Sequence, residues 1–214
     1  MLSNTDAYPA GITVRTEPVQ QRSADRITSL LDAAAELIDR NGIDGLTTSD
    51  VAARSESSVG VVYRYFPNIQ SLLRALATRN MEKFRQAVYT AMPEGSTDWM
   101  AGLDQAIDAY AELSRSEPGF RALRFGDIID ERFLQPEHSN NSLLAEMFQN
   151  LLVKRFHVED SDELTLDLEV LVEIIDALLH RAFLYEARGD ERFIQKLRGI
   201  LRDYMGKYET SAAK

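Results

Sequence analysis

The sequence predicts an all-α protein of about nine helices. Apolar residues recur at three- and four-residue steps along most of the 214 residues, which is the spacing of amphipathic helices. No segment shows the alternation of apolar and polar residues that is typical of a half-buried strand. Glycine, proline and asparagine interrupt the helical pattern at intervals, and these breaks set the expected helix ends.

The N-terminal segment, residues 1–21, shows no sustained periodicity and contains Pro9 and Pro18, so we expect a flexible arm there. From Ser23 onward, one apolar stripe predicts the first amphipathic helix. Asn41-Gly42 ends that helix, because these residues favour the left-handed conformation found at helix C-termini.

Two short helices are expected next. Thr47 precedes Asp50 by three residues, a capping-box spacing that predicts a helix over residues 48–54. Ser58 is a good N-cap for a second short helix over residues 59–65. Pro67 closes it, because the residue before a proline is pushed away from helical dihedral angles.

The rest of the chain is expected to be helical as well. A long helix runs from Ile69 past Val88. Further helices are predicted over residues 98–114, 120–129, 142–156, 162–188 and 190–208.

Composition excludes several classes of protein. The chain has no cysteine, which excludes disulfides, thiolate metal sites and cysteine nucleophiles. Its net charge is −10, but residues 1–80 carry eight Arg and nine acidic residues, so most of the acidity belongs to the C-terminal part. No stretch is apolar enough to cross a membrane, and the N-terminus does not have the features of a secretory signal, so we expect a cytoplasmic protein.

Enzyme chemistry is not expected. The three histidines, His138, His157 and His180, are far apart, and there is no glycine-rich phosphate loop. We therefore predict neither catalytic residues nor a metal site nor a cofactor.

Three helices within residues 23–66, the last two short and joined by a polar turn, match the helix-turn-helix plan. Residues 46–52, LTTSDVA, and residues 58–68, SVGVVYRYFPN, closely resemble the DNA-binding domain of the TetR family of bacterial transcriptional regulators. The resemblance implies a helix-turn-helix domain at about residues 22–70 and a larger ligand-binding and dimerisation domain at residues 71–214. It further implies a homodimeric repressor that binds a palindromic, double-stranded operator and is controlled by a small-molecule effector.

A helix that enters the major groove needs close approach, phosphate anchors and side chains that reach the bases. Tyr63 and Tyr65 cannot both lie on the same helix face, so one of them could pack in the core, whereas Val62 and Phe66 are expected to be core residues. The predicted DNA contacts are Thr47, Thr48, Ser49, Ser57, Ser58, Val59, Gly60, Tyr63, Arg64 and Tyr65.

The sequence departs from the family pattern near the turn. Glu56 and Ser57 stand where the family usually has a glycine and an apolar residue, and a carboxylate there repels phosphate. Ile69 stands where a phosphate-binding lysine is common. Arg22 and Arg26, with Arg15 on the arm, are candidates to compensate.

The apolar stripe of residues 162–188 is too wide for one intramolecular seam, which favours an oligomer interface, with an internal core helix as the alternative. The resemblance implies a four-helix bundle built from the last two long helices of each subunit. The predicted interface residues are Leu171, Ile175, Leu178, Phe183, Phe193, Leu197 and Leu201.

Aromatic and polar residues of the middle helices are candidates to line a mostly apolar ligand pocket, although plain core packing is the alternative for each. His180 is equally a candidate for the dimer seam. The candidate ligand contacts are Phe84, Trp99, Tyr110, Phe120, Phe125, Phe148 and His180. The alternative function is a helical small-molecule sensor or interaction module without sequence-specific DNA binding.

Overall fold

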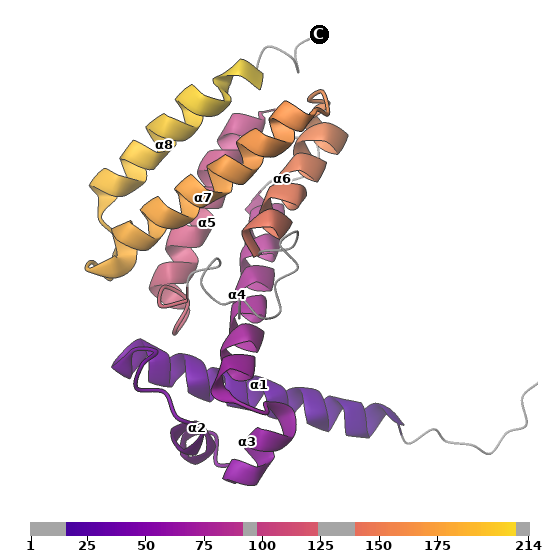
Figure 1. Cartoon of the computed structure of the whole chain (residues 1–214), viewed down its shortest axis with the longest axis vertical. Coiled ribbons are helices and arrows are strands. Elements are labelled where there is room, and N and C mark those ends of the chain that lie inside the picture. The colour runs from indigo at the N-terminus through magenta and orange to yellow at the C-terminus, as the bar shows by residue number, and fades with distance from the viewer. Residues whose placement is uncertain (1–15, 92–97, 124–139, 209–214) are drawn as a thin grey trace, which may run out of the picture.

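The computed structural model describes residues 16–91, 98–123 and 140–208 of the chain. This part has eight α-helices, a short 3-10 helix and no strand, which confirms the all-helical prediction (Figure 1). In chain order the elements are α1 (Thr16–Asn41), α2 (Thr48–Arg54), α3 (Val59–Tyr65), α4 (Ile69–Ala91), α5 (Trp99–Ser116), α6 (Asn140–Phe156), α7 (Asp162–Leu184), α8 (Glu191–Met205) and the 3-10 helix Gly206–Tyr208.

The described residues hold eight α-helices rather than the nine expected. The helix predicted over residues 120–129 is absent from its described part, because residues 118–122 form turns. Gly119 begins this irregular stretch with a φ of 71°, which no helical residue adopts. Residues 124–129 lie outside the described residues.

Several predicted boundaries also differ from the structure, most of all the start of α1 and the end of α7. α1 begins at Thr16, so the end of the expected arm is helical. Pro18 lies in its first turn, where the missing N–H of a proline is not needed. α7 ends at Leu184 instead of Arg188, and Gly189, with a φ of 85°, reverses the chain so that the Asp190 N–H donates to the Ala182 carbonyl.

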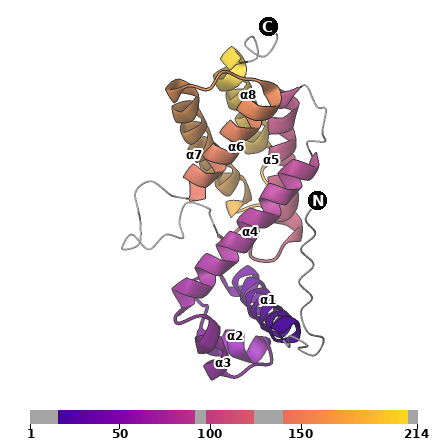
Figure 2. The same ribbon diagram turned by 90° about the vertical axis from the view of Figure 1, so that its right-hand side faces the viewer.

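The helices α1, α2 and α3 gather at one end of the molecule together with the start of α4 (Figure 2). We call this part the head. Its short helices lack the length to be stable alone, so burial against α1 and α4 holds them. The most deeply buried residues of the head core are Leu30, Ala34, Val51, Val62, Leu72 and Leu76.

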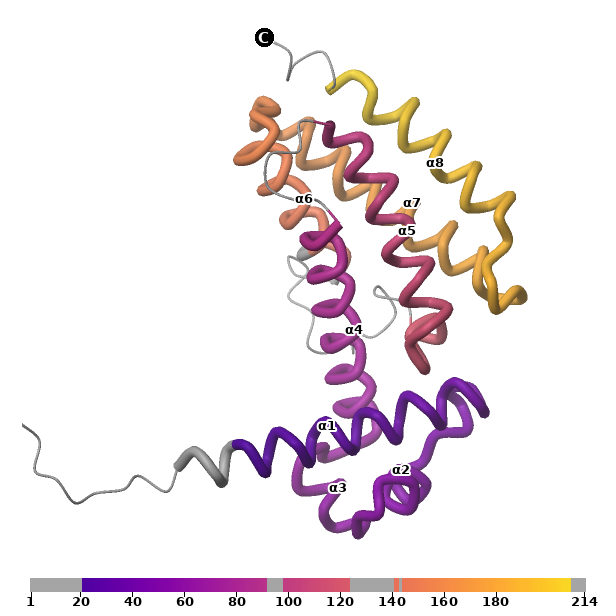
Figure 3. The backbone as a smooth tube through the Cα atoms, turned by 180° about the vertical axis from the view of Figure 1, so that it is seen from behind, coloured from indigo at the N-terminus to yellow at the C-terminus, as the bar shows by residue number. Residues whose placement is uncertain are grey.

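The body consists of α5 to α8 and the C-terminal half of α4. Within it, α7 packs against α6 on one side and α8 on the other (Figure 3). The fully buried residues of the body core are Ile107, Phe120, Leu164, Leu168, Leu171, Leu179, Leu197 and Met205.

The helix α4 belongs to both cores. Leu76 lies in the head core, whereas Phe84, two turns later, lies in the body core. The turn after α5 makes a second connection, because Phe120 packs in the body and Leu123 packs in the head. A movement of α4 or of this turn would therefore displace residues in both the head core and the body core.

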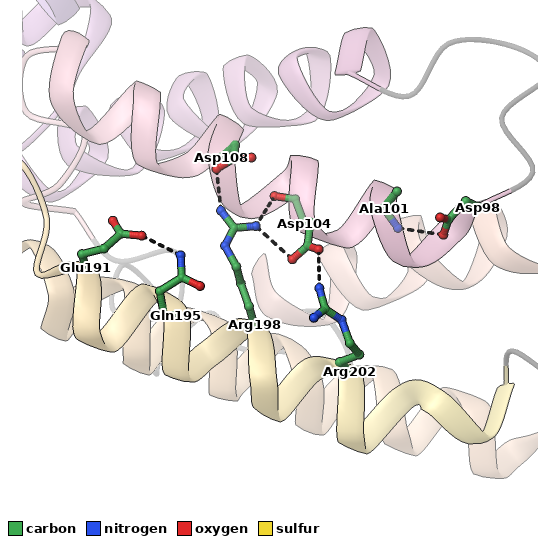
Figure 4. A network of polar contacts seen from close by, with 8 residues as sticks. All are labelled: Asp98, Ala101, Asp104, Asp108, Glu191, Gln195, Arg198 and Arg202. Atoms are coloured by element: carbon green, nitrogen blue, oxygen red, sulfur yellow. Dashed lines mark hydrogen bonds and ion pairs between the residues drawn. The ribbon is translucent and has the colours of Figure 1, made fainter.

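Ion pairs fasten α8 to α5 (Figure 4). Arg198 donates through Nη1 to Oδ1 of Asp104 at 2.9 Å and through Nη2 to Asp108. Arg202 donates to the other oxygen of Asp104, also at 2.9 Å. Because the Arg198 side chain is only 16% exposed, solvent screens its two pairs less than it screens a free surface pair.

Candidate functional site

Two side-chain caps shape the turn between α2 and α3. Thr47 Oγ1 accepts the backbone N–H of Asp50 at 3.1 Å, and Ser58 Oγ accepts the backbone N–H of Val61 at 3.3 Å. Both predicted caps are confirmed, and α3 begins where the sequence indicated. Between the caps, Glu56 adopts a left-handed φ of 51°.

One face of α3 is buried in the head and the other faces solvent. Val62 and Phe66 are buried, which confirms their predicted core role. Val59 is 39% exposed and Tyr63 52% exposed, and both stand among the exposed large hydrophobic side chains. Polar neighbours complete the surface formed by the start of α2, the turn and α3; its exposed or half-exposed residues are Thr47, Thr48, Ser49, Ser57, Ser58, Val59, Gly60, Tyr63 and Arg64.

The two tyrosines differ in burial. Tyr65 is half-buried and packs against the head core, and its hydroxyl accepts a hydrogen bond from Ser23 Oγ at 3.5 Å. The Tyr63 hydroxyl lies 3.4 Å from Thr48 Oγ1, which donates to it across the two helices. Tyr65 is therefore the one that contributes to packing, while both hydroxyls stay near the head surface.

Charges of both signs surround the start of α3. Arg22, Arg26 and Arg64 are exposed, and Arg26 donates through Nη1 to Ser57 Oγ at 3.1 Å. Glu56 is exposed within the turn itself. Ile69 packs against the head core, so it gives α4 an apolar contact in place of a cation. Arg15 lies outside the described residues.

The body contains an apolar cavity of about 20 Å³ between α4, α5, α6 and α7. The rings of Phe84 and Tyr110 meet edge to face in its wall, with centroids 5.9 Å apart. Tyr110 also meets Phe120 edge to face at 5.3 Å, which ties the cavity wall to the turn after α5. The lining residues are Phe84, Leu103, Ala106, Ile107, Tyr110, Leu144, Phe148, Val172, Ile175 and Asp176.

Three of the seven candidate ligand contacts line this cavity, namely Phe84, Tyr110 and Phe148. Trp99 and Phe120 are buried core residues that do not line it, and neither does His180. Phe125 lies outside the described residues.

Asp176 was not among the predicted site residues, although its position contained a signal. It lies four residues after Val172 and three before Leu179, which puts a carboxylate on the buried face of α7.

The predicted dimer residues are mostly internal. Leu171, Phe183, Leu197 and Leu201 are buried within the chain itself, so they form the body core and offer no free surface. Ile175 lines the cavity, and Leu178 and Phe193 are half-buried. The exposed apolar residues of α7 and its C-cap are instead Leu166, Val170, Leu184 and Tyr185.

Two kinds of feature are absent from the described residues. These residues contain no group of three or more His, Cys, Asp or Glu side chains that could hold a metal ion. Among the described helices, none combines the length and the apolar character that a membrane span needs.

Family models match both parts of the chain. The model described as bacterial regulatory proteins, tetR family, matches residues 30–76. The model described as tetracyclin repressor-like, C-terminal domain, matches residues 97–207. No curated protein matches the chain.

Solved structures share the fold. A TetR-family transcriptional regulator from Streptomyces coelicolor is 33% identical, with a TM-score of 0.71, and the match covers 86% of this chain and 99% of that one. A fatty acid degradation regulator from Bacillus halodurans is 18% identical with a TM-score of 0.61, over 81% of this chain and 96% of that one. A gamma-butyrolactone receptor is also 18% identical, with a TM-score of 0.56, and the match covers 90% of this chain and 96% of that one.

The two family models fall on the head and on the body, and the C-terminal one spans about half of the chain. The S. coelicolor regulator resembles the chain over nearly its full length. The chain therefore belongs to the TetR family of bacterial regulatory proteins.

Proposed function

We propose that this chain is a transcriptional repressor that binds a palindromic operator as a homodimer and is controlled by a small molecule in the body cavity. The observation that carries the proposal is the outward face of α3, where Val59, Tyr63 and Arg64 are exposed on a helix fixed by its caps. In this proposal residues 22–70 form the DNA-binding domain, and residues 71–214 bind the ligand and the partner subunit.

The surface of α3 fits the major groove in shape and chemistry. A Cβ added at Gly60 would meet only Ser58 Oγ, at 3.8 Å, so a groove wall can approach the backbone closely there. Val59 presents an apolar surface to thymine methyl groups, and Arg64 can donate to guanine or phosphate. Thr47, Ser49 and Ser58, with the free N–H groups at the start of α3, supply phosphate anchors.

The exposed apolar residues of α7 support dimerisation. Leu166 is 60% exposed and Val170 38% exposed, and Leu184 and Tyr185 extend the apolar surface to the end of the helix. Soluble proteins rarely leave such a run of large apolar side chains uncovered. Pairing α7 with its copy around a two-fold axis would put two heads on successive major grooves, about 34 to 36 Å apart.

Ligand control follows from α4. Phe84 lines the cavity in the body, and the start of the same helix packs in the head core. A ligand that widens the cavity shifts Phe84 and therefore α4, which changes the separation of the two heads. Operator and ligand then favour different states, so each lowers the affinity for the other.

The test is DNA binding to the duplex upstream of the gene, with a scrambled duplex as competitor. The proposal predicts specific binding that weakens steeply as salt rises from about 50 to 200 mM, because bound phosphates release counterions. Arg64→Ala and Tyr63→Phe should each weaken specific binding by about tenfold, since each removes a hydrogen bond at the interface. Arg188→Ala, which removes an exposed cation outside the proposed DNA-binding surface, is the matched control.

The second candidate is a ligand sensor that does not bind specific DNA, and Glu56 is the observation that favours it. An exposed carboxylate lies in the turn that would face phosphate, and Ile69 supplies no cation to offset it. This candidate predicts equal affinity for the specific and the scrambled duplex, and also for the head variants.

A further inference from the structure

We propose that the ligand of the body cavity is a mainly apolar molecule with one hydrogen-bond-donating group, bound most tightly as a protonated amine by Asp176. This inference rests on the proposed function, because it names the chemical class of the effector. It stands on the lining of the cavity and on the position of one carboxyl group in that lining.

The lining favours a ligand that is mostly apolar. Nine of the ten lining residues are aliphatic or aromatic, and the rings come from Phe84, Tyr110 and Phe148 on three different helices. Burying an apolar group against such a surface is favourable by about 25 cal/mol per Å². A highly polar ligand, such as a sugar or a nucleotide, would lose most of its hydrogen bonds to water in this cavity.

Asp176 selects the polar group of the ligand. It is 3% exposed and is the single acidic side chain among the described lining residues, which include no Lys, Arg or His. A carboxylate accepts hydrogen bonds and has about four acceptor sites, so it can accept a donor from a ligand in addition to any partner within the chain. A ligand carboxylate has no proton to donate to Asp176 and would lose its hydration in an apolar setting where the described lining residues offer no cation.

The walls of the cavity are closely packed. Its volume in this structure is about 20 Å³, roughly the space that one water molecule needs. A ligand as large as a single ring with a short alkyl chain must therefore spread the walls, and Phe84 is the wall residue that α4 contributes.

The experiment uses three probes of nearly equal shape, namely 4-butylbenzylamine, 4-butylbenzyl alcohol and 4-butylbenzoic acid. Each is titrated into the full-length protein by calorimetry at pH 7. The expected order of affinity is amine, alcohol, acid, with the amine at least about tenfold tighter than the acid, as a charge-assisted hydrogen bond predicts. This ranking uses the wild-type protein and does not depend on any variant folding.

The variant Asp176→Asn should weaken amine binding by about tenfold or more. It should also reduce the difference in affinity between the amine and the acid. Glu112→Gln is the matched control, because Glu112 is an exposed acid on α5, the helix that supplies four of the lining residues. It should leave all three affinities unchanged.

Three outcomes would overturn the inference in different ways. Tightest binding of the acid, or no effect of Asp176→Asn on the amine, contradicts the role of Asp176 while leaving the cavity as a ligand site. Absence of binding by all three probes contradicts the cavity as the effector site. None of these outcomes bears on operator binding by the head, which is measured separately. A failure of this inference can therefore be distinguished from a failure of the proposed DNA-binding function.

Discussion

Glu56 combines an unfavourable backbone conformation with an unfavourable charge. Its φ of 51° lies in the left-handed region, which costs an L-residue about 1 to 2 kcal/mol. Its carboxylate is exposed beside the start of α3. A residue that is strained and also repels the expected ligand of this surface lowers both stability and affinity.

We predict that Glu56→Gly raises the free energy of unfolding by about 0.5 to 1 kcal/mol, because glycine relieves the strain at some cost in chain entropy. It should also tighten DNA binding. Glu56→Gln, which keeps the strain and removes the charge, should tighten DNA binding with little change in stability. Urea unfolding and DNA titration separate the two effects, and a loss of stability in Glu56→Gly would disprove the strain.

Gly119 occupies a tighter position than Gly42, the glycine with positive φ that follows α1. A Cβ at Gly119 would lie 2.9 Å from the carbonyl oxygen of Ala35 in α1, whereas a Cβ at Gly42 would meet nothing within 4 Å. Both have left-handed φ values, of 71° and 76°. The pair therefore separates backbone strain from steric contact.

Gly42→Ala should destabilise the protein by about 1 kcal/mol through backbone strain alone. Gly119→Ala should cost about 1 to 3 kcal/mol more, because the turn after α5 must move away from α1. Thermal unfolding of the two variants measures the difference. Equal losses of stability in Gly42→Ala and Gly119→Ala would show that the turn after α5 is not tightly packed against α1.

The sequence predicts residue roles only where the local pattern determines them. Val62 and Phe66 are four apart on a short amphipathic helix, so their burial follows from periodicity. Asp176 was missed because a carboxylate between leucines interrupts the apolar pattern, and only packing reveals that it faces a cavity. Most of the predicted dimer residues are covered within the chain itself, because periodicity indicates which face is apolar but not which neighbour covers it.

At the scale of helices, Asp167 fastens the end of α8 and the 3-10 helix that follows it to α7. It is 8% exposed and accepts hydrogen bonds from the hydroxyls of Tyr204 at 2.8 Å and Tyr208 at 2.6 Å, with Lys207 Nζ at 2.7 Å. Burial alone would raise the pKa of Asp167, but the hydrogen bonds from Lys207, Tyr208 and Tyr204 hold it below its ordinary value. Burial and the bond to Asp167 raise the pKa of Tyr208 to about 12.

Asp167→Asn should lower the free energy of unfolding at pH 7 by about 2 kcal/mol, because three donors lose a charged acceptor. The lowered pKa means that Asp167 stabilises the fold above its unfolded pKa of about 4 and that this contribution is lost as pH falls below it. The difference in free energy of unfolding between wild type and Asp167→Asn should therefore shrink below pH 4. Thermal unfolding across pH 3 to 8 measures this difference, with Asp203→Asn, at an exposed position on α8, as control. A difference that does not change with pH contradicts the stabilising role of the ionised Asp167.

Helix ends were predicted well where a cap or a proline marks them. Thr47, Ser58 and Pro67 carry such chemistry, and the observed α2 and α3 match the predicted ranges. The C-terminal end of α7 was placed too late because no glycine or proline interrupts the helical pattern before Gly189, while the chain reversal there depends on packing against Phe183 and Ile194. Local sequence does not contain that tertiary contact.

At the scale of the whole molecule, the exposed apolar residues of α7 test the proposed dimer. Leu166→Glu should weaken self-association by about 100-fold or more, because a two-fold interface loses the burial of two leucines. Operator affinity should fall with it. Tyr89→Glu, at a 44% exposed aromatic residue on α4, is the control and should leave the dimer intact. Sedimentation as a function of concentration gives the result, and an unchanged dimer in Leu166→Glu would exclude this face of α7.

The central claim is that two copies of α3 enter successive major grooves of an operator. Hydroxyl-radical footprinting on the duplex upstream of the gene tests it most directly. The account predicts two protected half-sites related by a two-fold axis, with centres separated by about one helical turn or a small multiple of it, and loss of both in Leu166→Glu. A single protected segment without two-fold symmetry, or no protection beyond that of a scrambled duplex, would contradict the account.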